Sequence, residues 1–529
     1  MYDNERGLYI AHSPRGPLSI VGRMANRHGL IAGATGTGKT VSLQVMAETF
    51  SQAGVPCFMA DMKGDLSGIS QAGRMSGFIE KRLPEFGLQS PAFQACPVRL
   101  YDVYGEQGHP MRATVSQMGP DLLARILELN ETQTGVLGVV FRVADERGLL
   151  LDDLKDLRAM LDYVAQNAQQ FATKYGNVSK ASVGAIQRAL LALENQGADK
   201  FFGKPEFEIA DLLATEGGRG VMSVLAADRL MLQPKLYSTF LLWLLSELYS
   251  TLPEVGDQDL PRLVFFFDEA HMLFDGTTKA LTDKVEQVIR LIRSKGVGIY
   301  FVTQSPTDLP ENILGQLGNR IQHALRAYTP KDQKAVRTAA DTFRANPDFK
   351  TDEAIMQLET GEALVSFLDE KGAPTMVERA KVLFPLSQIG AITEGQRLDL
   401  IKQSPVYGKY DTSVDRESAF EVLLAESEAP VETEAAEVSL PAKSAKAEKE
   451  SKGKQKPGLL AKVLKAVLTA VTASLGTILG AFVTEKVTGK KQRKSSTSAT
   501  GRVVKNATSA ATRTVTRELT RDILGNLIK

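Results

Sequence analysis

The sequence predicts an α/β protein with a mostly parallel β-sheet. Short apolar segments of strand length recur in residues 1–105 and again in residues 251–400. Between these strand-length segments lie others whose apolar residues are three and four positions apart, which is the spacing of one helix face. Polar or glycine-rich residues follow several of the apolar segments directly. Strands that alternate with helices pair in parallel, so these three observations favour a sheet covered on both faces.

The bulk composition is that of a soluble globular protein. The chain has 529 residues, of which 43% are hydrophobic and 24% are charged. Its formal net charge is +1, so contact with a polyanion would need a local basic patch. Cys57 and Cys96 are the only cysteines, and we expect neither a disulfide framework nor a metal cluster. The N-terminus lacks the basic start and apolar run of a secretory signal, which predicts a cytoplasmic location.

Residues 1–105 predict the first part of the sheet core. The apolar segment 28–32 predicts a strand, and the apolar spacing across 40–50 predicts a helix. The run VPCFMAD at 55–61 predicts a buried strand that ends in polar residues. Residues 97–104 predict a further strand.

A glycine-rich run connects the first predicted strand to the first predicted helix. It reads GATGTGKT and matches the pattern G-x-x-x-x-G-K-[ST]. Its glycines let backbone N–H groups curl around a phosphate, and the helix points its positive end at the anion. We expect Lys39 to contact the β- and γ-phosphates and the Thr40 hydroxyl to bind Mg²⁺. The predicted nucleotide-binding residues are Gly33, Ala34, Thr35, Gly36, Thr37, Gly38, Lys39 and Thr40.

Residues 106–250 predict a large, mainly helical insertion. Apolar residues recur at helical spacing through 122–141, and Trp243 lies in another apolar stretch, 240–248. Packing into a core explains both patterns. The short apolar run 221–226 is consistent with an additional strand.

Residues 251–400 predict the second part of the sheet core. LVFFF at 263–267 and GIYFV at 298–302 are short, strongly apolar and bounded by polar turns. The segments EALVSF and TMVERAKVLF predict a terminal hairpin around Lys371 and Gly372.

An acidic pair follows the LVFFF strand directly. A parallel strand delivers the residue after it to the carboxyl edge of the sheet, where ligands of such sheets bind. Asp268 is therefore predicted to hold Mg²⁺ through water, and Glu269 to orient and activate an attacking water. His271, which is close by, is predicted to be structural or a coupling residue.

Polar residues also end two other predicted strands. Gln304 follows the GIYFV strand, where its side chain is placed to touch a γ-phosphate and report its loss; capping of the strand is the alternative. Asp61 and Lys63 end the 55–61 strand on the same edge. They are candidates for contact with the water or with a neighbouring subunit.

These segments together resemble the HerA/FtsK superfamily of ATPases, and within it the HerA-like branch. The resemblance covers roughly residues 8–390 and rests on GATGTGKT, ADMKGD, FFFDEAH and VTQSP, which begin at positions 33, 60, 265 and 302. The phosphate loop alone indicates only an NTPase. The glutamine of the last motif narrows the class of protein to this group. Residues 120–141 look like an uncharacterised bacterial subfamily of HerA-like proteins.

The resemblance implies a RecA-like P-loop NTPase core that hydrolyses ATP with Mg²⁺. It also implies a homo-hexamer with ATP bound between subunits, and DNA as the substrate that is moved. An arginine from the neighbouring subunit completes the site in this superfamily and stabilises charge on the γ-phosphoryl group. Arg293 in RLIRSKGVG is the best match, with Arg290 and Arg320 as alternatives.

Archaeal HerA helicases carry a β-barrel before the phosphate loop. About 30 residues precede Gly33 here, which we expect to be too few for that domain. The helical region 106–250 is a candidate to replace part of its function.

The C-terminal part predicts a linker and a separate tail. Residues 401–457 include a glutamate-rich stretch and then a stretch rich in Lys, Ala and Ser, which predicts a partly disordered linker. Residues 458–529 predict amphipathic and basic helices. The 19 residues 466–484 carry no charge, and 486–529 carry 11 Lys or Arg against two acids.

Apolar residues from Leu460 to Phe482 recur at helical spacing in the tail. This apolar stripe has three interpretations. It is an amphipathic packing or oligomerising helix, a membrane-surface helix, or a true membrane span. The basic stretch is either a patch for DNA or anionic lipid, or a solvated helix face.

Two classes of function compete on these observations. The first is a DNA translocase or helicase driven by ATP hydrolysis. The second is a membrane-associated secretion or assembly ATPase that acts on protein. A small-molecule kinase is disfavoured, because the interval from Thr40 to Asp268 is long and no acceptor-binding lid is evident.

Overall fold

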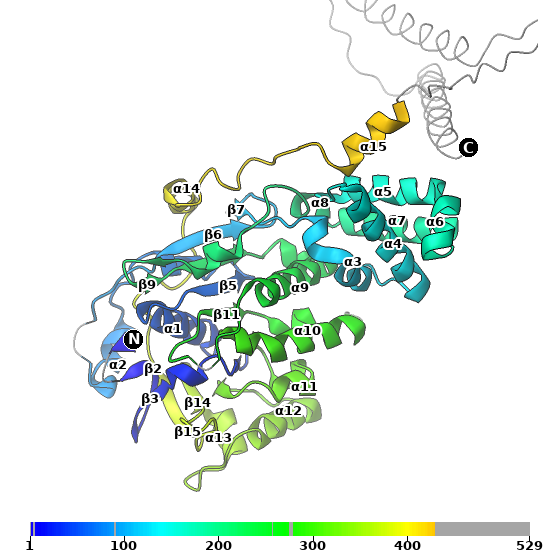
Figure 1. The fold of residues 1–529 in the computed structure, drawn as a ribbon. Coiled ribbons are helices and arrows are strands. Elements are labelled where there is room, and N and C mark those ends of the chain that lie inside the picture. Colours follow the sequence, from blue (N-terminus) through cyan, green and yellow to red (C-terminus); the bar gives the residue numbers. More distant parts are fainter. Residues whose placement is uncertain (1, 4–5, 89–90, 257, 275–278, 429–529) are drawn as a thin grey trace, which may run out of the picture. The chain divides into compact units, whose positions relative to one another are not determined.

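Parallel strands form the centre of one large sheet (Figure 1). The computed structural model describes residues 2–3, 6–88, 91–256, 258–274 and 279–428. Within this part of the chain, eight strands pair in parallel in the order β13–β4–β12–β11–β5–β10–β6–β7. Their bounds are β4 Gly29–Ala32, β5 Cys57–Asp61, β6 Val98–Asp102, β7 His109–Pro110, β10 Met222–Ala226, β11 Leu263–Phe267, β12 Val297–Thr303 and β13 Asn319–Gln322. The mostly parallel α/β fold that the sequence predicted is confirmed.

An antiparallel extension continues the sheet beyond β13. It comprises β14 Glu362–Ser366, β15 Glu378–Val382, β2 Gly7–Ser13, β3 Gly16–Ile20 and β1 Tyr2–Asp3. The predicted hairpin is β14 and β15, which pair antiparallel. Its turn closes where Gly372, at φ 77°, donates its N–H to the Asp369 carbonyl. The β2–β3 hairpin had no counterpart in the sequence prediction.

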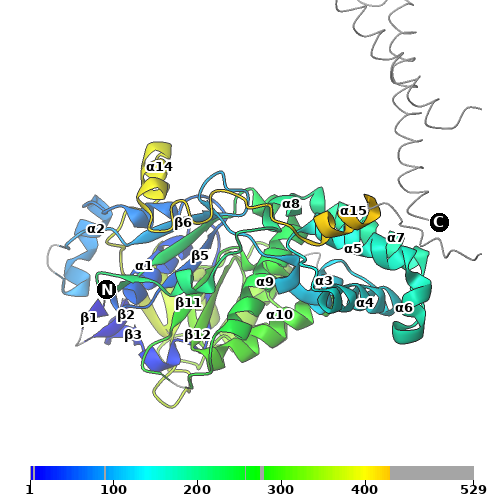
Figure 2. The same cartoon turned by 45° about the horizontal axis from the view of Figure 1, so that its top comes forward.

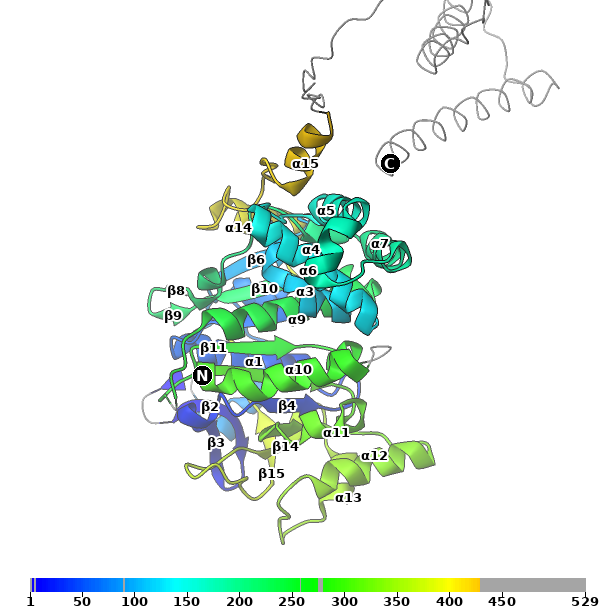
Figure 3. The same ribbon diagram turned by 45° about the vertical axis from the view of Figure 1, so that its right-hand side comes forward.

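Helices cover both faces of the parallel sheet. Along β11, Val264 and Phe266 pack into the same apolar cluster as α1 (Lys39–Gln52). Phe265 and Phe267 alternate with them and pack into the cluster that contains α9 (Pro234–Thr251) and α10 (Lys279–Ile292). This alternation is the period of two that a strand imposes on its side chains. Figure 3 shows α9 and α10 lying along the sheet.

The segment between β7 and β10 forms a helical lobe at one end of the sheet (Figure 2). It contains α3 Val115–Ile126, α4 Glu131–Arg147, α5 Leu154–Gln166, α6 Ala168–Tyr175, α7 Lys180–Glu194 and α8 Ala198–Phe201. Asn130, Asp153 and Ser179 cap α4, α5 and α7 through their side chains. Strand β10, which lies at the position of the additional strand allowed by the sequence, belongs to the sheet between β5 and β6.

Shorter elements complete the described chain. They are α2 Gly77–Arg82, α11 Glu311–Leu314, α12 Pro330–Asp341, α13 Thr351–Gln357, and the two-stranded sheet of β8 Thr215–Glu216 and β9 Arg219–Gly220.

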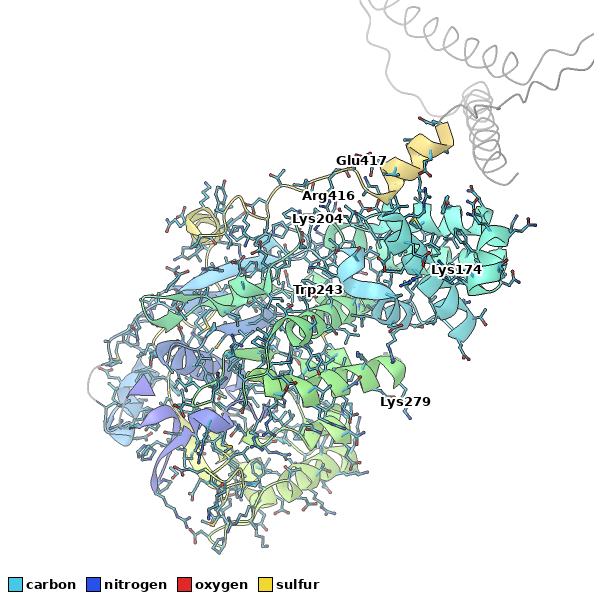
Figure 4. The ribbon with its side chains drawn as sticks, viewed as in Figure 1. Lys174, Lys204, Trp243, Lys279, Arg416 and Glu417 are labelled. Carbon is cyan, nitrogen blue, oxygen red and sulfur yellow. The ribbon has the colours of Figure 1, made fainter. Side chains whose placement is uncertain are left out.

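The chain leaves the sheet through α14 (Glu394–Gln403) and then crosses to the helical lobe, ending in α15 (Ala419–Glu428). We call residues 404–428 the strap. Arg416 on the strap forms an ion pair with Asp152 of the lobe, and the Val414 N–H donates to the Lys204 carbonyl. Figure 4 labels Arg416 and Lys204. The first part of the predicted linker is therefore ordered structure.

The remaining linker residues and the predicted tail lie outside the described residues. This includes the uncharged stretch 466–484 and the basic stretch 486–529. Among the described residues, no helix has the length and apolar character that crossing a membrane requires. The predicted domain boundaries stay predictions.

Candidate active site

The glycine-rich run forms the loop between β4 and α1. The Gly33 N–H donates to the Thr303 carbonyl at 3.3 Å, and the Ala34 N–H donates to the Ala324 carbonyl at 2.8 Å. Gly33 has φ 153°, and a Cβ there would lie 2.5 Å from the Cβ of His323. A side chain at this position would therefore displace the loop. The loop is tied to the ends of both neighbouring strands, β12 and β13.

Helix α1 begins at Lys39, directly after the loop. The first N–H groups of a helix have no partner within the helix, and its positive end attracts anions. The Lys39 side chain is buried and its Nζ donates to the Ala34 carbonyl at 3.1 Å. Burial lowers the pKa of Lys39, although the nearby Glu269 and Asp268 carboxylates oppose this. Thr40 is half-buried, while Thr35 and Gly36 at the tip of the loop are exposed.

His323 lies against the phosphate loop, and the sequence analysis missed it. The residue follows β13 and is fully buried. Its Nδ1 lies 2.9 Å from the Glu362 carbonyl and therefore carries the proton, which leaves Nε2 to accept from the Ser42 hydroxyl at 2.7 Å. Burial lowers the pKa of His323 to about 4, so the ring is neutral at physiological pH. The only signal in the sequence is a histidine one residue after a strand.

The predicted metal residue Asp268 directly follows β11. It is 3% exposed; its Oδ1 accepts from the Glu269 N–H at 2.9 Å, and its Oδ2 has no partner among the described residues. Burial raises the pKa of Asp268 to about 6, and the charge of Glu269 adds to this effect. A buried carboxylate oxygen without a partner, together with the Thr40 hydroxyl, is a donor set that suits Mg²⁺. The residues present therefore fit the ion.

Glu269 has both carboxylate oxygens engaged. Lys63 Nζ lies 2.7 Å from Oε1, Gln304 Nε2 lies 3.4 Å from Oε2, and His271 Nδ1 lies 3.5 Å from Oε2. Burial alone would raise the pKa of Glu269, but the hydrogen bond and charge of Lys63 lower it below its usual value. The backbone of Glu269 is left-handed, with φ 47° and ψ 47°. Such a conformation is costly for a residue with a side chain and persists where the surroundings impose it.

Asp61 shapes the turn that presents Lys63. Its Oδ2 accepts from the Leu66 N–H at 3.1 Å. Burial, and then the charge of Asp65, raise its pKa to about 6. The structure therefore brings Lys63 to Glu269 and leaves Asp61 as an anchor of the turn behind it.

The predicted arginine lies at the other end of the sheet. Arg293 begins a helical turn four residues before β12, whereas Gln304 directly follows that strand. Arg290 pairs with Glu286, and the Arg320 guanidinium donates to the Leu317 and Leu314 carbonyls. None of the three joins the phosphate site of its own subunit. The action of any of them on a neighbouring subunit stays a prediction.

Together, the fold and the site define a RecA-like P-loop NTPase. The phosphate loop follows β4, the acidic pair follows β11, and β12 with Gln304 lies between them. The chain belongs to the Helicase HerA-like C-terminal family, whose model matches residues 7–529. The resemblance that the motifs predicted is confirmed.

Several archaeal proteins named DNA double-strand break repair helicase HerA are similar to part of the chain. The protein of Sulfolobus acidocaldarius is 35% identical over 99 residues, which is 18% of this chain and 19% of that protein. The protein of Sulfurisphaera tokodaii is 33% identical over 99 residues, with the same shares of 18% and 19%. The chain thus spans about a fifth of the length of these curated relatives.

Two solved structures have a similar course of the chain. The bacterial conjugative coupling protein TrwBdeltaN70 is 16% identical with a TM-score of 0.49, over 74% of this chain and 92% of that one. VirB4 of Thermoanaerobacter pseudethanolicus is 16% identical with a TM-score of 0.45, over 72% and 97%. Likeness at this level says nothing about the substrate.

Proposed function

We propose that this protein binds ATP with Mg²⁺, hydrolyses it, and uses the energy in a ring motor that moves DNA. The observation that carries the proposal is that Lys39, Asp268 and Glu269 come together at the carboxyl ends of β4 and β11. Gln304 directly follows β12, which lies between these two strands. Phosphoryl transfer to water needs a positive charge for the phosphates, an oxygen ligand for the metal and a base for the water.

Each residue has one role in this proposal. The N–H groups of the loop and the Lys39 ammonium hold the phosphates, while Thr40 and Asp268 hold Mg²⁺. The ion, when bound, neutralises charge on the β- and γ-phosphates. Glu269 accepts a proton from the attacking water, and Gln304, within 3.4 Å of that carboxylate, contacts the γ-phosphate end. Arg293 of a neighbouring subunit stabilises the charge that develops on the γ-phosphoryl group.

DNA and a homo-hexamer are the proposed substrate and assembly. The support is family membership and the matched relatives, which are named as DNA double-strand break repair helicases. The net charge of +1 provides no global field for DNA, so binding would depend on local Lys and Arg side chains and would weaken steeply with salt.

The test is steady-state ATP hydrolysis by the purified full-length protein, with and without double-stranded DNA, over a series of salt concentrations. The proposal expects a rate that DNA stimulates, and a stimulation that declines as salt rises. A rate that is indifferent to DNA of every length and strandedness would overturn DNA as the substrate. It would favour a motor that acts on protein. An absent rate under all conditions would overturn the ATPase itself.

A further inference from the structure

The described site contains one cation that the proposed reaction does not yet use. Lys63 lies two residues after β5 and reaches across to Glu269, which lies two residues after β11. The Nζ–Oε1 distance is 2.7 Å. The Lys63 side chain is 48% exposed and the Glu269 side chain only 9%, so the pair lies where the site opens to solvent.

The turn that carries Lys63 is anchored on both sides. Gly64 has φ 74° and reverses the chain directly after Lys63. The buried Asp61 carboxylate holds the Leu66 N–H, and the Ser67 hydroxyl donates to the Gly64 carbonyl at 3.1 Å. An ion pair between two mobile surface side chains contributes little, because both lose rotamer freedom. Here the backbone that carries Lys63 is already ordered by these contacts.

The carboxylate that Lys63 contacts is equally constrained. Glu269 adopts a left-handed backbone and its other oxygen faces Gln304 and His271. Asp268, directly before it, is buried. Lys63 holds Oε1, so the orientation of the carboxylate depends on this contact.

We propose that Lys63 is the positioning residue of Glu269: it directs the Glu269 carboxylate so that it can accept a proton from water. This inference rests on the proposed ATP hydrolysis and deepens it. Lys63 acts through Glu269, not on the nucleotide.

The first experiment asks whether the pair forms, and it does not depend on activity. Melting temperatures of full-length protein are measured for wild type, Lys63→Met, Glu269→Gln and the double variant at neutral pH. If the two side chains interact, the double variant loses less stability than the sum of the single variants. Additive losses would overturn the proposal.

The second experiment asks what the pair does in turnover. We measure kcat and KM for ATP at neutral pH for wild type, Lys63→Met and Lys63→Arg. Lys63→Met leaves the Glu269 carboxylate free to turn away from the water, so kcat falls by about tenfold. KM stays unchanged, because Lys63 does not contact the nucleotide. Lys63→Arg keeps a cation at this place and restores kcat.

The matched control is Lys381→Met. Lys381 on β15 pairs with Glu85 at the same Nζ–Oε1 distance of 2.7 Å, and its side chain is 36% exposed. Glu85 is more exposed than Glu269, at 41% against 9%. The variant loses a lysine–glutamate pair outside the phosphate site and leaves kcat in place.

The outcomes separate this inference from the proposed function. A kcat that is unchanged in Lys63→Met, or that Lys63→Arg does not restore, would overturn the positioning role while ATP hydrolysis stands. A wild-type protein without hydrolysis, but with non-additive melting temperatures, would overturn the proposed function and leave the ion pair demonstrated.

Discussion

His323 holds the phosphate loop through a ring that must stay neutral. Its two nitrogens serve two different partners, the Glu362 carbonyl and the Ser42 hydroxyl. Protonation would add an N–H at Nε2, so the Ser42 hydroxyl would have to change from donor to acceptor. The ring is fully buried and lies beside Lys39. The ring therefore links the loop, α1 and β14 only above the pH at which it takes up a proton.

This arrangement predicts a pH-dependent contribution to stability. The pKa of His323 is about 4 in the fold and about 6.5 in an unfolded chain, so the unfolded state binds more protons between these values. The contribution of about 3 kcal/mol is complete above pH 6.5 and is lost as pH falls towards 4.

The measurement compares melting temperatures of wild type and His323→Gln from pH 7.5 to pH 5. Asp61 and Asp268 have raised pKa values, so they change stability with pH in the direction opposite to His323. Both residues are present in both proteins, so their effect cancels in the comparison. We expect the difference between the two proteins to narrow as pH falls. A constant difference would contradict the neutral ring.

In the proposed function, Lys39 is the residue on which phosphate binding depends most. Its ammonium is the proposed charge for the phosphates, because backbone N–H groups alone lack a full charge. We expect Lys39→Ala to slow hydrolysis by about 10²- to 10³-fold and to weaken triphosphate binding, measured by calorimetry. Lys350→Ala, which removes an exposed lysine paired with Glu353, is the control and should leave both quantities unchanged.

At the scale of elements, a buried carboxylate on α5 helps to fasten the strap to the helical lobe. Asp156 in the first turn of α5 is fully buried. It accepts from the Asp152 and Asp153 N–H groups on its own side, and from the Ser418 hydroxyl and the Phe420 N–H of the strap. A single side chain thus serves as a cap of α5 and as the anchor of α15.

Asp156→Ala removes all four hydrogen bonds and leaves buried donors without partners. We expect the free energy of unfolding in urea to fall by about 3 kcal/mol, and limited proteolysis to cut residues 404–428 first. Asp415→Ala is the control, because its carboxylate is 77% exposed and pairs with Lys155. Equal stability of the Asp156→Ala protein would contradict the anchoring role.

At the scale of the whole molecule, the parallel sheet follows from the sequence strand by strand. Segments such as 263–267 and 298–302 are apolar throughout because both of their faces are covered. The phosphate loop and the acidic pair were predictable for a related reason: each directly follows such a strand, and parallel strands end at a common edge.

The rest of the site depends on contacts between distant segments. Strand β13 reads NRIQ, and with one strongly apolar residue it has no strand pattern of its own. Its burial comes from β4 and β14 on either side. His323 was missed with it. The contact of Lys63 with Glu269 spans 206 positions in the chain, and no local pattern predicts which strand end faces which.

The edge hairpin of β2 and β3 was missed for a different reason. Pro14 and Gly16 are a turn signal between its strands. Strand β3 lies off the main strand order, pairs with β2 and is mostly half-buried, so its segment GPLSI shows no apolar run. Strand β2 contains the buried residues Leu8 to Ala11, but its partners β15 and β3 come from pairing that only the fold reveals.

The measurement that tests the account most directly compares nucleotide binding and turnover in Glu269→Gln. The amide keeps the size of the side chain and cannot accept the proton from water, while Lys39, Thr40 and Asp268 remain. We expect ATP to bind with nearly wild-type affinity, and hydrolysis in the presence of Mg²⁺ to fall by about 10²-fold or more. Turnover equal to that of the wild type would contradict the role of Glu269, and with it the active site described for this protein.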